Sequence, residues 1–116
     1  MRQDGKSAEL MAAAHLQRNG LTLLESNYRC RFGEIDLIMR DTDEIVFVEV
    51  RLRSSAVFGG AAASITTAKQ QKIARTAQHY LQLHGSAACR FDAVLFDALA
   101  EDRIHWLKNA FEATWT

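Results

Sequence analysis

Residues 33–53 have the sequence GEIDLIMRDTDEIVFVEVRLR, and this stretch decides the fold. Apolar and polar residues alternate on both sides of a polar connection at residues 41–44, and such alternation is typical of half-buried β-strands. The connection suits a four-residue turn between two antiparallel strands. The stretch therefore predicts a hairpin in which each strand has one apolar side that faces a core.

The register of this hairpin follows from its apolar sides. A slip by one residue would turn every side chain to the opposite face, so both apolar sides enter one core only if paired residues have numbers with an odd sum. A turn at residues 41–44 then pairs Leu37 with Val48 and, one step further, Asp36 with Glu49. Arg51 lies on the same face as Glu49, two residues along the strand. The predicted hairpin thus brings two acids and a cation together.

The facing acids Asp36 and Glu49 require a positive partner, because like charges directly opposed on an antiparallel pair are destabilising. Two partners are open from the sequence. One is the guanidinium of Arg51, and the other is a divalent ion such as Mg²⁺, which is commonly held by one or two carboxylates with waters and substrate phosphates. The remaining interpretation is an ordinary solvated sheet face that carries alternating charges.

Helices and further strands flank the hairpin. The expected elements are a helix at 7–19, a strand at 21–30, a helix from Thr66 or Thr67 to His84, strands at 89–96 and 103–108, and a short helix or tail at 110–115. The order is αβββαβ plus a further strand, and the helix between the third and fourth strands allows a right-handed parallel connection. The predicted fold class is therefore α/β, a mixed β-sheet flanked by helices.

Composition limits the class of protein. The chain has 116 residues, of which 48% are hydrophobic and 24% charged, as expected for one globular domain over residues 1–116. No apolar stretch has the length of a membrane span or the form of a signal peptide, so we expect a cytoplasmic protein without a membrane partner. Cys30 and Cys89 lack metal-type spacing and are expected to be free thiols.

Charge is unevenly distributed although the net charge is zero. Residues 1–49 carry nine acids and six bases, residues 50–91 carry six bases and no acid, and residues 92–116 carry five acids and two bases, which gives −3, +6 and −3. The six bases of the middle block are Arg51, Arg53, Lys69, Lys72, Arg75 and Arg90. Cations next to the acid pair would grip phosphates. The alternative is a solvated helix face beside the acids of the first block.

Several segments together resemble one family. They are Gly33-Glu34-Ile35-Asp36-Leu37-Ile38, Val46-Phe47-Val48-Glu49-Val50-Arg51-Leu52-Arg53, Lys69 with its helix, and Arg90-Phe91-Asp92. Over nearly the whole chain they resemble the YraN family of small uncharacterised bacterial proteins. That family is similar to the restriction-endonuclease-like nucleases, especially the archaeal-type Holliday junction resolvases. The resemblance implies a restriction-endonuclease-like fold and a metal-dependent site in which an Asp, a Glu and a Lys cleave a phosphodiester.

By this resemblance, Asp36 and Glu49, with the carbonyl of Val50, would hold Mg²⁺ or Mn²⁺. Glu9 matches an accessory acid that would orient a water molecule, although the first turn of a helix also favours a carboxylate through the helix dipole. Arg51 stands where the resolvases have a lysine. Because Arg stays charged at any accessible pH, it could stabilise a phosphate in the transition state or neutralise the acids, but it could not act as a base.

Lys69 is a candidate for the missing lysine. It lies in line with Ile73, Thr76 and Tyr80 at helical spacing, so its stem points along the sheet-facing stripe. The alternative is a first-turn residue whose ammonium reaches water. The residues expected to contact nucleic acid are Arg53, Lys69, Lys72 and Arg75.

These features predict a metal-dependent nuclease-like protein that binds or cleaves structured or branched DNA. Whether it is a Mg²⁺- or Mn²⁺-dependent endonuclease depends on the effect of Arg51. The alternative is a catalytically inactive nucleic-acid-binding or protein-interaction module that kept the nuclease fold, with Arg51 in a salt bridge to the acids. A two-fold homodimer would suit a four-way junction, by analogy with the resolvases.

Overall fold

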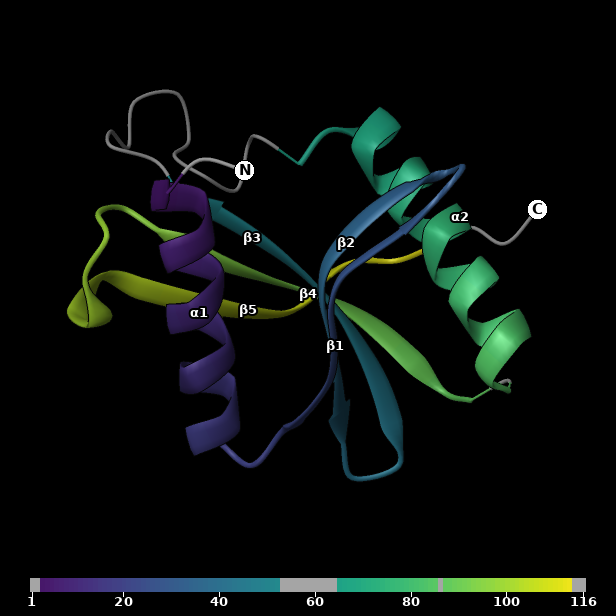
Figure 1. The fold of residues 1–116 in the computed structure, drawn as a ribbon, viewed down its shortest axis with the longest axis horizontal. Coiled ribbons are helices and arrows are strands. Elements are labelled where there is room, and N and C mark those ends of the chain that lie inside the picture. The colour runs from purple at the N-terminus through teal and green to yellow at the C-terminus, as the bar shows by residue number, and fades with distance from the viewer. Residues whose placement is uncertain (1–2, 53–64, 86, 114–116) are drawn as a thin grey trace.

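A computed structural model describes residues 3–52, 65–85 and 87–113, and it shows a five-stranded sheet between two helices (Figure 1). The elements are α1 (Gln3–Arg18), β1 (Thr22–Cys30), β2 (Gly33–Asp41), β3 (Glu44–Leu52), α2 (Thr67–His84), β4 (Cys89–Phe96), the 3₁₀ turn η2 (Glu101–Arg103) and β5 (Ile104–Phe111). The strands lie in the order β1-β2-β3-β4-β5. β3 and β4 are parallel, and the other neighbours are antiparallel. The predicted α/β class and element order are confirmed.

The β2–β3 hairpin has the predicted register, because Leu37 pairs with Val48. The turn is tighter than predicted. Asp41 and Glu44 also pair, which leaves a loop of two residues that begins with Thr42 at φ 57°. A positive φ at the first loop position is a property of the turns that close two-residue hairpins.

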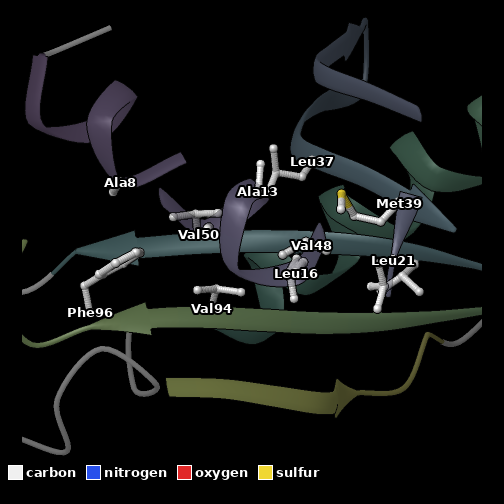
Figure 2. Close-up of a cluster of buried hydrophobic side chains, with 12 residues drawn as sticks. Ala8, Ala13, Leu16, Leu21, Leu37, Met39, Val48, Val50, Val94 and Phe96 are labelled. Atoms are coloured by element: carbon white, nitrogen blue, oxygen red, sulfur yellow. The ribbon is translucent and has the colours of Figure 1, made fainter. Parts of the chain in front are cut away.

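Both faces of the sheet are buried, one under each helix. On the α1 face, side chains from β2, β3 and β4 pack around Ala13 and Leu16 (Figure 2). On the other face, Ile38 and Phe47 are fully buried in a cluster that includes Ala77 of α2. The sequence predicted one apolar side for each hairpin strand. The second side is covered as well, since the parallel β3–β4 connection places α2 over it.

The ends of α1 and β5 differ from the prediction, whereas α2 has the predicted ends. α1 begins earlier, at Gln3. α2 begins at Thr67 and is capped by Thr66, whose hydroxyl accepts a hydrogen bond from the Lys69 N–H at 3.2 Å. β5 continues to Phe111, so part of the predicted terminal helix or tail is strand. The ring of Phe111 stacks on Phe91 of β4 with 5.0 Å between centroids, which gives the longer strand its packing.

Arg90 does not belong to a solvent-facing basic patch, contrary to the prediction from charge distribution. Its side chain is 10% exposed and lies 3.0 Å from each of three acids: Asp41, Glu44 and Asp92. Asp92 is fully buried and also accepts a hydrogen bond from Trp106 Nε1 at 2.9 Å. Arg90 therefore joins the hairpin turn to β4 and is not available to phosphates.

The structure also bears on the two cysteines and on the expectation of no membrane span. Cys30 and Cys89 are free cysteines, as predicted. Neither α1 nor α2, the two α-helices in the described part of the chain, is long and apolar enough to cross a membrane.

Candidate functional site

The β2–β3 ladder ends at the pair Leu37–Val48, and the candidate site begins one residue further along each strand. Asp36 and Glu49 would form the next pair. Instead, the Asp36 side chain reaches to β3, where its Oδ2 accepts a hydrogen bond from the Val50 N–H at 2.8 Å. A carboxylate therefore takes the place of a backbone acceptor, and this fixes its position between the two strands.

Glu49 is buried, with 3% of its side chain exposed. Its Oε2 lies 2.7 Å from Arg51 Nη2 and 3.5 Å from Lys69 Nζ. Arg51 comes from the same strand, two residues along, and Lys69 comes from the first turn of α2 that Thr66 caps. The fold thus brings cations from two distant segments to a single carboxylate oxygen.

These close contacts leave polar atoms without hydrogen bonds. Glu49 Oε2 and Arg51 Nε are both buried and have no hydrogen-bond partner among the described residues. The 2.7 Å contact between Glu49 and Arg51 is an ion pair by distance, but its atoms are not aligned as a hydrogen bond. Buried atoms of this kind cost about 1–3 kcal/mol each, and in native proteins they often mark a place where another group binds.

The second acid changes the protonation of Glu49. Burial, a hydrogen bond with Asp36 and the negative charge of Asp36 together raise the pKa of Glu49 to about 8, while Arg51 and Lys69 act in the opposite direction. Burial and Asp36 outweigh the two cations. At neutral pH Glu49 is therefore largely protonated.

Glu9 approaches Asp36 from α1. It is buried, and its pKa is raised to about 7, first by burial and then by the charge of Asp36, whereas a hydrogen bond with Asn27 lowers it. Asn27 lies opposite Asp36 on β1 and has φ 53°, a conformation that Asn adopts more readily than most residues. Asn27 was not identified from the sequence, since only its tolerance of positive φ distinguishes it.

The expected position of Glu9 in a first helical turn is wrong. Because α1 begins at Gln3, Glu9 lies more than one turn inside the helix. The helix dipole acts mainly within the first turn, so it does not account for this acid. The proximity of Glu9 to Asp36 remains as the reason to consider it part of the site.

The site offers oxygen donors of the kind that Mg²⁺ and Mn²⁺ prefer. They are the carboxylates of Asp36 and Glu49 and the carbonyl of Val50. The Val50 N–H points to Asp36, and the N–H and C=O of one strand residue point to the same side, so this carbonyl also faces β2. Within residues 3–52, 65–85 and 87–113, no group of three or more Asp, Glu, His or Cys residues is arranged to hold a metal ion. With only two carboxylates, a Mg²⁺ ion at this place would take its remaining ligands from waters and substrate phosphates.

The residues expected to bind nucleic acid have different environments. Lys69 is divided between solvent and Glu49, with 37% of its side chain exposed. Lys72 and Arg75 are exposed on α2 and form no ion pair with any described residue. Arg53 lies outside the described residues. The cationic surface of α2 thus begins at the acid pair.

Comparison with known proteins relates the chain to a family. The family model described as "Uncharacterised protein family UPF0102" matches residues 8–96. A UPF0102 protein of Nitrosomonas europaea is 64% identical over 109 residues, which cover 93% of this chain and 92% of that protein. A UPF0102 protein of Methylobacillus flagellatus is 57% identical over 113 residues, covering 97% and 100%. One of Nitrosospira multiformis is 50% identical over 117 residues, covering 100% and 98%.

Proposed function

The chain belongs to the uncharacterised protein family UPF0102, as its resemblance to YraN predicted, and from its site we propose a metal-dependent nuclease-like protein that binds and cleaves structured or branched DNA. The observation that carries the proposal is the arrangement around Glu49. Asp36 lies within hydrogen-bond reach and raises its pKa, and Arg51 and Lys69 meet at its Oε2 in a buried position. Strongly shifted acids beside cations are typical of catalytic sites.

In the proposed reaction, Asp36, Glu49 and the Val50 carbonyl would hold Mg²⁺ or Mn²⁺, which when bound supplies Lewis-acid polarisation of the scissile phosphate and lowers the pKa of water. Asp36 is oriented for this task by the Val50 N–H. Glu49, whose pKa is raised, would release its proton on holding such a cation, since metal-binding carboxylates are deprotonated. Glu9, with a pKa of about 7, is suited to orient the attacking water and to accept its proton near neutral pH.

The two cations have separate tasks in this proposal. Lys69 Nζ lies farther from Glu49 than Arg51 does, and its side chain is partly exposed, so it can turn from Glu49 to a substrate phosphate. It would supply the lysine function from α2 instead of from β3. Arg51 would stabilise the negative charge that develops on the phosphate oxygens, since its planar fork can donate to two of them.

One observation favours the alternative function. The 2.7 Å ion pair between Arg51 and Glu49 would, if it persisted, neutralise Glu49 within the fold. The protein would then be a catalytically inactive nucleic-acid-binding or protein-interaction module. The raised pKa of Glu49 argues against full neutralisation, because a carboxylate compensated by two cations would have a lowered pKa.

Divalent-ion binding separates the two functions. Calorimetric titration of the protein with Mg²⁺ and with Mn²⁺, without DNA, should detect binding that is lost in Asp36→Asn and in Glu49→Gln but kept in Glu101→Gln, which changes an exposed acid of η2. Cleavage is then measured on duplex, flap, single-stranded and four-way-junction DNA and on RNA. Activity that survives in Asp36→Asn would indicate a contaminating nuclease. Absence of both ion binding and cleavage in the wild type would leave the inactive module.

The proposal retains three expectations from the sequence. They are a cytoplasmic location, DNA as the partner, and a two-fold homodimer on branched substrates. Sedimentation of the protein alone and with a four-way junction would test the homodimer.

A further inference from the structure

A second surface adjoins the site along α2. One line of residues at helical spacing runs from Lys69 in the site through Lys72 and Thr76 to His79. The β1–β2 turn packs on this line. A Cβ built on Gly33 would lie 3.2 Å from Thr76 Oγ1 and 3.7 Å from Lys72 Cβ, so the turn and the helix are in close contact.

The turn holds an aromatic ring beneath a guanidinium group. The Arg31 Cζ lies 4.8 Å from the centroid of the Phe32 ring. The other neighbour of this ring is His79, with 6.3 Å between the centroids and an angle of 65°. His79 is itself held by the Tyr28 hydroxyl, 2.6 Å from Nδ1. Phe32 is therefore positioned by a defined set of contacts, and an exposed planar cation covers it.

Two of the three cations of this region form no ion pair with a described residue. Arg29 forms an ion pair with Glu34. Arg31 and Lys72 are exposed and have no such partner among the described residues. One of these two cations covers the Phe32 ring, and the other lies where the turn meets α2.

The distance from this region to the acids is short. Gly33 precedes Asp36 by three residues on β2, which at about 3.3 Å for each residue is roughly 10 Å. Lys72 follows Lys69 by one helical turn, about 4.5 Å along the axis of α2. Stacked nucleotides of a DNA strand are roughly 3.4 Å apart. A DNA strand with its scissile phosphate at Asp36 could therefore place the base about three nucleotides away at the β1–β2 turn.

We infer that Arg31, Phe32, Lys72 and His79, here called the turn surface, bind an unpaired nucleotide of the substrate strand about three nucleotides from the scissile phosphate. Its base stacks on Arg31 and Phe32, and its phosphate lies at Lys72. Aromatic rings and guanidinium planes are the groups on which unpaired bases stack, and every base offers such a face. The inference rests on the proposed function and narrows its substrate to DNA with a single-stranded segment about three nucleotides from the cleaved bond.

The test is binding, measured separately from cleavage. Asp36→Asn protein in EDTA is titrated with a labelled oligothymidine and with a duplex of the same length. Single strand should bind more tightly than duplex. On this background, Phe32→Leu should weaken single-strand binding about tenfold without changing its salt dependence, because stacking releases no counterions. Lys72→Ala should instead lower the log–log salt slope by about 0.7.

Control variants keep the test decisive. Arg40→Ala removes an exposed cation at the opposite end of β2 and should change neither quantity. Arg31→Ala alters an exposed side chain, so it tests stacking even if Phe32→Leu folds poorly. An abasic nucleotide at the stacked position should weaken binding to the protein that retains Phe32 and cause no further loss in Phe32→Leu.

Two results separate this inference from the proposed function. Equal affinity for duplex and single strand, with Phe32→Leu and Arg31→Ala both unchanged, would overturn the turn surface even in an active nuclease. Single-strand binding with the expected dependence on Phe32, in a wild type that cleaves no substrate, would support the turn surface and refute the nuclease.

Discussion

Replacement of Glu49 by Gln tests the central feature of the site, which is a carboxyl group that the fold keeps protonated. Burial and Asp36 raise its pKa from 4.5 to about 8. Between these two values the folded protein holds a proton that the unfolded chain has released. At about 1.4 kcal/mol for each pKa unit, the difference amounts to roughly 5 kcal/mol. Because the unfolded chain binds fewer protons in this range, the free energy of unfolding falls as the pH rises from 4.5 to about 8.

Glu49→Gln should remove this decline. The amide resembles the protonated acid and cannot ionise, so variant and wild type should have similar stability at about pH 5, where Glu49 is protonated in the fold. Above about pH 8 the variant should be more stable by several kcal/mol, and each kcal/mol corresponds to roughly 4 °C in melting temperature. The assay is thermal denaturation in EDTA across this pH range. Glu9 contributes a decline of the same sign, since its pKa is also raised, so Glu9→Gln is measured in parallel.

Addition of Mg²⁺ or Mn²⁺ completes the assay. A cation that takes the place of the proton should stabilise the wild type at about pH 8 and so raise its melting temperature. The gain in the free energy of unfolding is about 2.7 kcal/mol when the cation concentration is a hundred times its dissociation constant. The cation should have little effect on Glu49→Gln. A Glu49→Gln variant that is less stable at every pH, by the 3–5 kcal/mol typical of a broken buried ion pair, would refute a protonated Glu49. Glu49 would then be a permanently ionised partner of Arg51 and Lys69.

Three further predictions follow from the contacts. Arg51→Lys should fold normally and cleave on the order of a hundredfold more slowly, because it loses a bidentate donor. Lys69→Ala should abolish cleavage with little change in melting temperature. A wild-type cleavage rate in Lys69→Ala would exclude Lys69 from the site. Asp92→Ala should lower the free energy of unfolding, measured in urea, by roughly 3–5 kcal/mol, because the Arg90 guanidinium loses its buried partner. A loss below about 1 kcal/mol would contradict a stabilising ion pair between Arg90 and Asp92. Arg75→Ala should lower the log–log salt slope of duplex binding by about 0.9, and an unchanged slope would place Arg75 away from the phosphates.

The hairpin could be predicted because its determinants are local. The alternation of Ile35 and Leu37 with charged residues, and the position of the turn, fix the register within one short segment. The burial of the charged side could not be predicted, because its cover comes from α2, which follows the hairpin at a distance in the sequence. Lys69 could be placed on the inner side of that helix from its spacing alone. Its meeting with Arg51 at one oxygen of Glu49 depends on how α2 lies on the sheet.

Charge counting along the chain failed at Arg90 for a related reason. The block that contains Arg90 has no acid, yet the acids that neutralise it, Asp41, Glu44 and Asp92, come from the neighbouring blocks in sequence. Strand pairing brings residues 46 and 90 together and so places the hairpin turn beside the start of β4. A basic block in sequence becomes a basic surface only where the fold leaves it unpaired.

The unsatisfied groups of this site lie where the proposed function needs them. At Asp36 the ladder loses a backbone pairing, but the Val50 N–H is satisfied by the carboxylate, so the break in the sheet leaves no orphan donor there. The orphan atoms are Glu49 Oε2 and Arg51 Nε, on the side that Lys69 shares. A fold under selection for stability alone would remove them, for instance by replacing both side chains with apolar ones. Their presence beside a carboxyl group of raised pKa concentrates the energetic cost of the site on the atoms that would meet a metal ion and a phosphate.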